Sequence, residues 1–230
     1  MTRVPHLVPE VVDDWSTDEA EVVLQRWIDA PTLLETTVST TTSALAGAAL
    51  GDIHRQRGPY AGSLDGRFRF ANQAEAFGSR WRHALGLVSG EYPVLARRLG
   101  DWAAPRLAAM PRYTVHRLVH GDFGPTNILV SGVRCLVIDW EHARWGDPYE
   151  DLAKIRVARR FPEPNGFGAE PEIWSALTAA WARTADVTWE CPEPTMELYE
   201  TYYVMCLAMF FDDVPNRRLA RLEHLTAHLA

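Results

Sequence analysis

Lysine is almost absent from this sequence of 230 residues, whose 23 Lys and Arg residues include a single lysine, Lys154. Any chemistry that needs a lysine must therefore use that one residue or do without. The first glycine of the chain is Gly47, so no glycine-rich loop precedes it.

Cysteine is also scarce: Cys135, Cys191 and Cys206 are widely spaced and form no CxxC pair. This pattern argues against a disulfide framework and against zinc, and favours reduced thiols in a cytoplasmic protein.

The longest apolar run near the C-terminus, residues 202–211, is far shorter than the roughly 20 residues of a membrane helix, so a buried helix is expected. The N-terminus lacks an apolar signal core. A net charge of −7 argues against nucleic acid as the main partner.

Apolar periodicity and turn residues predict few, central strands and many helices. Strands are expected at residues 21–28, 113–119, 127–130 and 134–138, with a further extended piece at 4–12. Helices are expected at 44–57, 73–87, 92–110 with a break or kink at Pro105, 147–161, and two or three within 171–230; residues 60–72 are expected to form a loop. Asp147, followed by Pro148, is typical of a helix N-cap.

One segment combines three oxygen-bearing side chains at short spacing. Asp122 lies five residues before Asn127, and a predicted hairpin with its turn at Ser131-Gly132 brings Asp139 back towards Asn127. A carboxylate can orient or deprotonate an attacking hydroxyl, while an amide oxygen and a second carboxylate suit Mg²⁺. This combination indicates phosphoryl transfer.

The segments HGDFGPTNILV, CLVIDWE and GDPYEDLA resemble the aminoglycoside phosphotransferase and choline kinase group of protein-kinase-like enzymes. Upstream, AGAALGDIH is similar to the first helix of that group's large lobe, and VVLQRWIDAPTL to its last small-lobe strand and hinge. The resemblance implies an α+β, protein-kinase-like fold. Residues 1–35 would be a remnant of the small lobe and hinge, and 36–230 the helical large lobe with the catalytic and metal-binding loops.

The same resemblance implies a role for each matching residue. Asp122 would be the catalytic base, with His120 supporting its loop, and Asn127 and Asp139 would bind Mg²⁺. Asp147 and Asp151 would brace the catalytic loop, and the backbone near Gln25, Arg26 and Trp27 would meet the base of ATP or GTP.

The sequence departs from the family pattern in its N-terminal part. The family has a phosphate-covering loop and a phosphate-pairing lysine there, whereas this sequence has neither before residue 36. Three explanations stay open: the sequence starts late, it is a degenerate kinase, or it is a short form that uses the large lobe differently. Arg3 or Arg26 would be a poor substitute, because an arginine fork differs from a lysine point charge.

The acceptor is expected to be a small molecule with positive charge, such as an aminoglycoside. Residues 139–213 contain 15 Asp or Glu against six Arg or Lys, which favours a cationic ligand, although a generic acidic surface gives the same count. The acids proposed for this site are Glu197, Glu200, Asp212 and Asp213. Two other functions compete: a non-catalytic binding or regulatory module, and a metal-dependent hydrolase using His120, Asp122 and Asp139.

Overall fold

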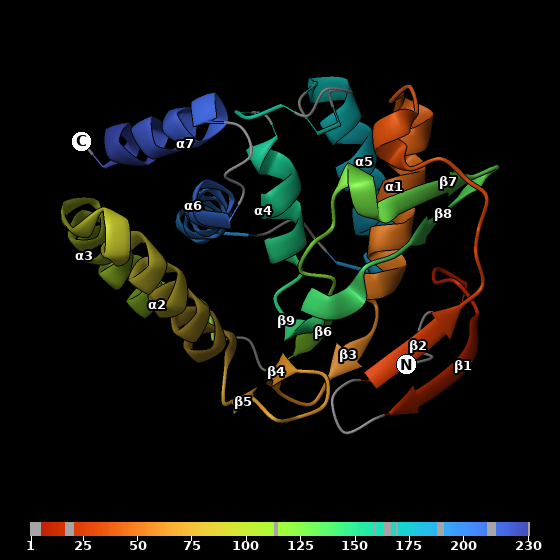
Figure 1. Cartoon of the computed structure of the whole chain (residues 1–230), viewed down its shortest axis with the longest axis horizontal. Coiled ribbons are helices and arrows are strands. Elements are labelled where there is room, and N and C mark those ends of the chain that lie inside the picture. Colours follow the sequence, from red (N-terminus) through yellow and green to blue (C-terminus); the bar gives the residue numbers. More distant parts are fainter. Residues whose placement is uncertain are drawn as a thin grey trace. The chain divides into compact units, whose positions relative to one another are not determined.

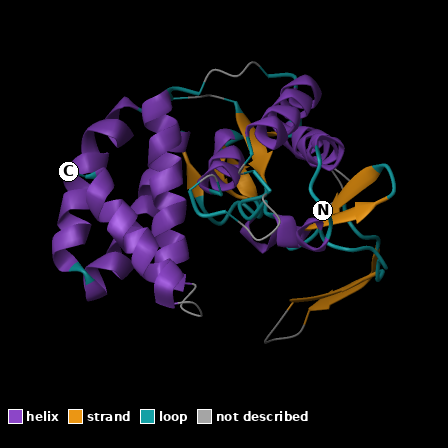
Figure 2. Cartoon of the chain, turned by 90° about the horizontal axis from the view of Figure 1, so that it is seen from above, coloured by secondary structure: helices purple, strands orange, loops and turns teal. Residues whose placement is uncertain are grey.

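The structure, a computed structural model, describes residues 6–16, 21–112, 115–158, 160–162, 167–168, 170–187, 191–210 and 215–229. Helices predominate and the strands are short, as the sequence predicted (Figure 2). The chain divides into two compact units, each built from separate stretches. Unit 1 comprises residues 1–56, 120–142 and 158–188, and unit 2 comprises 57–119, 143–157 and 189–230. The expected division at residue 35 stays a prediction.

The described residues of unit 1 form two antiparallel hairpins and a pair of helices, labelled in Figure 1. Its strands are β1 (Val11–Ser16), β2 (Glu21–Gln25), β7 (Ile128–Ser131) and β8 (Arg134–Val137). Its helices are α1 (Thr40–His54) and α5 (Pro171–Ala185), with short 3-10 turns η1 (Leu33–Glu35), η2 (Pro125–Asn127) and η3 (Trp140–His142).

The hairpin β7–β8 has its predicted position, and earlier residues cover its two edges. Gly132 makes the turn with a φ of +60°. The Val130 amide donates to the Pro31 carbonyl at 2.9 Å, and the Val137 amide donates to the Leu7 carbonyl at 2.6 Å. These bonds satisfy backbone groups that an isolated hairpin would leave open, and they hold the strands next to the predicted site.

Unit 2 contains a five-stranded sheet in the order β3-β6-β9-β4-β5, in which all pairs are antiparallel. These strands are β3 (Arg57–Gly58), β4 (Ala61–Ser63), β5 (Arg69–Phe70), β6 (His116–Val119) and β9 (Arg144–Gly146). The helices of this unit are α2 (Gln73–Glu91), α3 (Pro93–Ala109), α4 (Tyr149–Val157), α6 (Glu193–Phe210) and α7 (Pro215–His228). None of the described helices is long and apolar enough to cross a membrane.

Several predicted boundaries were wrong for local physical reasons. Helix α1 begins at Thr40 because the Ser39 hydroxyl accepts the Thr42 amide and the Thr42 hydroxyl accepts the Ser39 amide. This reciprocal cap has Thr where Glu or Gln is usual. The stretch predicted as a loop, 60–72, contains β4 and β5, which are too short to show alternation. Of the extended piece expected at 4–12, residues 4 and 5 lie outside the described residues, and of the rest only Val11 and Val12 belong to a strand, β1.

Two further corrections concern helices. Pro105 does not break α3, which runs on to Ala109. The carbonyl that loses its partner belongs to the exposed Asp101, where water can replace the bond. Helix α4 ends at Val157 rather than Phe161. The three helices within 171–230, by contrast, confirm the prediction.

Glycines in α1 allow it to pack closely on α5. A Cβ on Gly47 would lie 2.1 Å from the Leu177 carbonyl oxygen, and one on Gly51 would lie 2.5 Å from the Thr184 Cβ. The Trp181 indole, fully buried, donates to His54 Nδ1 at 2.8 Å. Backbone approach of this kind leaves no room for a side chain, so the two helices depend on glycine at these positions.

We expect Gly47→Ala to destabilise the protein by about 2–3 kcal/mol, because the new methyl group overlaps the α5 backbone. Urea unfolding measures this change. The matched control is Gly86→Ala in α2, where a Cβ meets no atom within 4 Å. That substitution should stabilise the helix by about 0.5–1 kcal/mol. Equal effects of the two substitutions would contradict the packing argument.

Candidate active site

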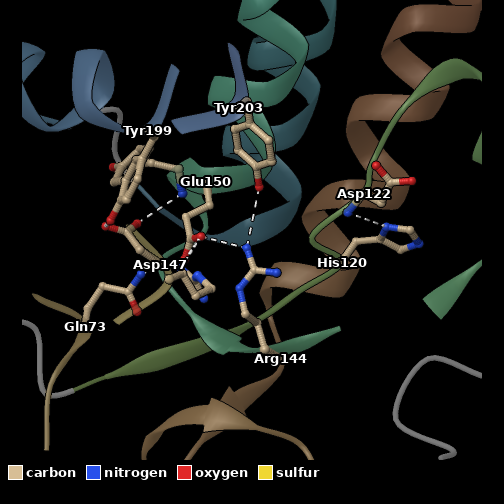
Figure 3. A network of polar contacts seen from close by, with 10 residues as sticks. Gln73, His120, Asp122, Arg144, Asp147, Glu150, Tyr199 and Tyr203 are labelled. Atoms are coloured by element: carbon tan, nitrogen blue, oxygen red, sulfur yellow. Dashed lines mark hydrogen bonds and ion pairs between the residues drawn. The ribbon is translucent and has the colours of Figure 1, made fainter. Parts of the chain in front are cut away.

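The loop that carries Asp122 is held by His120, which is fully buried. The Asp122 amide donates to His120 Nδ1 at 3.2 Å, so that nitrogen is the unprotonated one. Nε2 therefore carries the proton and donates to the Ile138 carbonyl at 3.0 Å. Gly121, with a φ of +85°, provides the turn between the histidine and the aspartate. Figure 3 shows the His120–Asp122 contact.

Asn127 lies directly against Asp122. Its Nδ2 donates to the Asp122 carbonyl at 2.9 Å and to the Asp122 carboxylate at 2.8 Å. Because both partners are acceptors, the amide nitrogen faces Asp122 and the amide oxygen faces elsewhere. No described residue donates to that oxygen, which leaves it available as a ligand.

Asp139 is brought to the same end of the hairpin by strand pairing. The Ile138 amide donates to the Asn127 carbonyl at 3.0 Å, so Asp139 follows a residue that is bonded to Asn127. Asp139 is exposed and has a φ of +63°, a left-handed conformation that is uncommon for residues other than glycine. Strained backbone of this kind is typical of functional positions.

The structure thus places His120, Asp122, Asn127 and Asp139 within one unit. The arrangement offers a half-buried Asp122 carboxylate oriented by the Asn127 amide, and the backbone pairing of Ile138 with Asn127 brings in the exposed Asp139 as the following residue. No group of three or more His, Cys, Asp or Glu that could hold a metal is present in the described part of the chain. The oxygen atoms of Asn127 and Asp139 are the hard donors that suit Mg²⁺.

Unit 2 contains a buried polar network centred on Glu150 (Figure 3). The Glu150 carboxylate accepts from Gln73 Nε2 at 2.6 Å, from Arg144 Nη2 at 2.7 Å and from Arg80 Nη2. Burial raises the pKa of this carboxyl, but the two guanidinium groups outweigh burial and hold the pKa below its usual range. Arg144 Nη2 also lies 3.5 Å from the Tyr203 hydroxyl, so the network joins α2, β9, α4 and α6.

No local pattern in the sequence points to this network. Glu150 was expected only as part of a helix start, and its partners Gln73 and Arg80 are 77 and 70 residues away. Buried charges of this kind require partners, and those partners come together only when the fold forms.

Asp147 caps α4, as predicted, and is buried. Its carboxylate accepts from the Tyr149 amide at 3.0 Å and from the Tyr199 hydroxyl at 2.9 Å. Burial raises the pKa of Asp147 to about 7, and these two hydrogen bonds only partly oppose it. Asp151 is also fully buried in α4. Both residues belong to unit 2, so their expected bracing of the catalytic loop stays a prediction.

Two of the acids predicted for the acceptor, Glu197 and Glu200, lie near arginines within unit 2. Glu200 is buried and its carboxylate lies 2.6 Å from Arg156 Nε. Glu197 is partly exposed, and its carboxylate lies 3.8 Å from Arg106 Nε. Asp212 and Asp213 lie outside the described residues. A cationic ligand at Glu200 would have to compete with an internal arginine, whereas Glu197 is more accessible.

The residues predicted to contact the nucleotide base lie at the end of β2 and directly after it. Gln25 is its last residue, and Trp27 is 87% exposed. The Arg26 amide donates to the Glu10 carbonyl at 2.8 Å, and its guanidinium pairs with the Glu10 carboxylate at 2.7 Å. The Arg26 guanidinium is therefore paired with a neighbouring acid. This pairing makes Arg26 a still poorer substitute for a phosphate-binding lysine.

Comparison with known proteins identifies the class. The model of the phosphotransferase enzyme family matches residues 2–187, and the chain belongs to that family. Viomycin phosphotransferase of Streptomyces vinaceus is 36% identical over 90 residues, which are 35% of this chain and 31% of that protein. The matched stretch is thus less than a third of the relative's length.

Two solved structures show the same fold. A thermostable mutant of aminoglycoside phosphotransferase APH(4)-Ia, in ternary complex with AMP-PNP and hygromycin B, is 16% identical with a TM-score of 0.68. That match covers 98% of this chain and 79% of the other. A choline/ethanolamine kinase family protein from Mesorhizobium loti is 20% identical with a TM-score of 0.62, covering 96% and 73%. The expected resemblance and fold class are confirmed.

The raised pKa of Asp147 predicts a specific pH dependence of stability. Between about pH 4 and 7 the unfolded carboxyl loses its proton while the folded one keeps it, so this residue lowers the free energy of unfolding as pH rises. The asparagine of Asp147→Asn cannot ionise. The free energy of unfolding of this variant, relative to that of the wild type, should therefore rise by on the order of 2 kcal/mol between pH 5 and pH 8. Urea unfolding at the two pH values measures the gain.

Tyr199→Phe is the control for this prediction. It removes the hydroxyl that bonds Asp147 but keeps the carboxyl, so its stability should still fall as pH rises from 5 to 8. A constant difference between wild type and Asp147→Asn at both pH values would contradict the assignment.

Proposed function

We propose that this protein transfers the γ-phosphate of a magnesium–nucleoside triphosphate to a hydroxyl of a small, cationic acceptor of the aminoglycoside kind. The observation that carries the proposal is the contact between Asn127 and Asp122, with Asp139 joined to Asn127 through the neighbouring Ile138. Family membership supports it, as do the viomycin phosphotransferase relative and the AMP-PNP and hygromycin B bound to a protein of the same fold. The protein is expected to act in the cytoplasm.

In this reaction Asp122 acts on the acceptor hydroxyl. The acceptor oxygen forms a bond to the γ-phosphorus, the bond from that phosphorus to the bridging oxygen breaks, and the nucleoside diphosphate leaves. The hydroxyl proton passes to the Asp122 carboxylate. Asn127 holds that carboxylate by a 2.8 Å hydrogen bond, which fixes its direction without removing its ability to accept a proton.

Asn127 and Asp139 fit a magnesium ion. The Asn127 amide oxygen accepts from no described residue and Asp139 is exposed, so an oxygen donor is available from each. Proteins usually bind Mg²⁺ through one or two carboxylates, with phosphates and water completing the shell. When bound, the ion would neutralise charge on the phosphates.

The remaining parts of the site follow the family pattern. The backbone at Gln25, Arg26 and Trp27 would meet the base of ATP or GTP, and residues 1–35 would serve as small lobe and hinge beside the large lobe, 36–230. Asp147 and Asp151 would brace the loop of Asp122. For the acceptor we assign Glu197 first, because it is partly exposed, and then Glu200, Asp212 and Asp213.

A non-catalytic binding module is the second candidate. The absence of lysine from residues 1–153 favours it, because these residues supply no equivalent of the family's phosphate-pairing lysine. Calorimetry with Mg²⁺ and ATP separates the two functions when combined with a turnover assay. Binding without turnover supports the module, and binding with turnover supports the enzyme.

We expect Asp122→Asn to lower kcat by about 10²–10⁴-fold, because the acceptor hydroxyl loses its proton acceptor. Release of ADP with hygromycin B or viomycin as acceptor measures this change. The affinity for Mg²⁺–ATP should stay unchanged. Asp101→Asn, on the exposed surface of α3, is the matched control and should keep full activity. Full turnover by Asp122→Asn would remove Asp122 from the mechanism.

A further inference from the structure

Trp140, which directly follows Asp139, makes two contacts within unit 1. Its indole Nε1 donates to the Val137 carbonyl at 2.9 Å, so the side chain reaches back to the last residue of β8. Its ring meets the His120 ring edge-on, with 4.8 Å between centroids and 62° between planes. The indole thus closes the turn from Val137 to Trp140 and covers the histidine that holds Asp122 in place.

The left-handed backbone conformation of Asp139 is unusual for its place in the chain. Among the described residues only Asp139 and Asp186 have positive φ without being glycine. Asp186 follows the end of α5, where a left-handed residue is an ordinary helix cap. Asp139 follows a strand and precedes a 3-10 turn, so no helix end accounts for its conformation.

The residues on either side of Asp139 are fixed by hydrogen bonds. Ile138 donates its amide to Asn127 and accepts from His120 Nε2, each at 3.0 Å. Trp140 is fixed by its bond to Val137. Asp139 is the one residue between these two anchored neighbours, and it is the residue that has the left-handed conformation.

We propose that Trp140 is a positioning residue, which holds Asp139 in its left-handed conformation and so presents the Asp139 carboxylate to the metal ion. This inference rests on the proposed function. The indole N–H is the essential feature. Phenylalanine could pack on His120 in the same way, but it has no donor for the carbonyl of Val137, a fully buried residue. Nothing in the D-W-E sequence alone distinguishes this role from ordinary core packing.

The test is Trp140→Phe, which removes the donor and keeps an aromatic ring on His120. Binding of Mn²⁺, a paramagnetic substitute for Mg²⁺, is measured by water proton relaxation with AMP-PNP present, so no turnover is needed. We expect the Kd for Mn²⁺ to rise about tenfold, which corresponds to about 1.4 kcal/mol. Turnover should recover at saturating Mg²⁺. Trp174→Phe, at a half-buried tryptophan of α5, is the matched control and should leave the Kd unchanged.

Hydrogen exchange of the indole N–H groups provides a second readout in the metal-free protein. The Trp140 signal, assigned by its loss in Trp140→Phe, should be protected relative to that of the exposed Trp27. An unchanged Kd for Mn²⁺ in Trp140→Phe, with normal binding by the wild type, overturns this inference alone. Absence of Mn²⁺ binding in the wild type overturns the proposed function together with it. An unprotected Trp140 indole contradicts the contact itself.

Discussion

The imidazole of His120 connects the two loops on which the candidate active site depends. One ring nitrogen accepts the Asp122 amide and the other donates to the Ile138 carbonyl, so a single buried side chain fixes the loop before β7 and the end of β8. The connection requires the neutral ring, because a doubly protonated imidazole could not accept from an amide. Phe123 and Trp140 surround the ring and keep it away from solvent. Through this one group, the position of the base and the position of the metal ligand become interdependent.

In unit 2 a buried carboxylate, that of Glu150, connects separate elements through charged partners. Glu150 carries its charge in the interior because two arginines and a glutamine share it, and these partners join α2 and β9 to α4. Asp147, three residues earlier, has no cationic partner at such distance among the residues that the structure describes, and burial raises its pKa. The pKa values of two buried carboxyls in one short segment are thus shifted in opposite directions. The direction depends on whether positively charged groups lie beside the carboxyl.

The candidate site was largely predictable because its geometry is local. Asp122, Asn127 and Asp139 lie within 18 residues, and a hairpin with a clear turn signal accounts for the pairing of Ile138, the residue before Asp139, with Asn127. The functional role assigned to Trp140 was not predictable, since an aromatic residue after a strand is usually core. The boundaries that failed, at α1, β4 and β5, depended on a Thr cap and on strands too short to carry a pattern.

The sequence by itself determined the spacing of an acid, an amide and a second acid around one hairpin, because side-chain order and turn chemistry are properties of neighbouring residues. Tertiary structure alone decided which polar groups are buried and with whom they pair. Gln73 meets Glu150 across 77 residues, and Gly47 meets the backbone of Leu177. Such contacts carry no local pattern, since their free energy arises only when distant segments exclude water together.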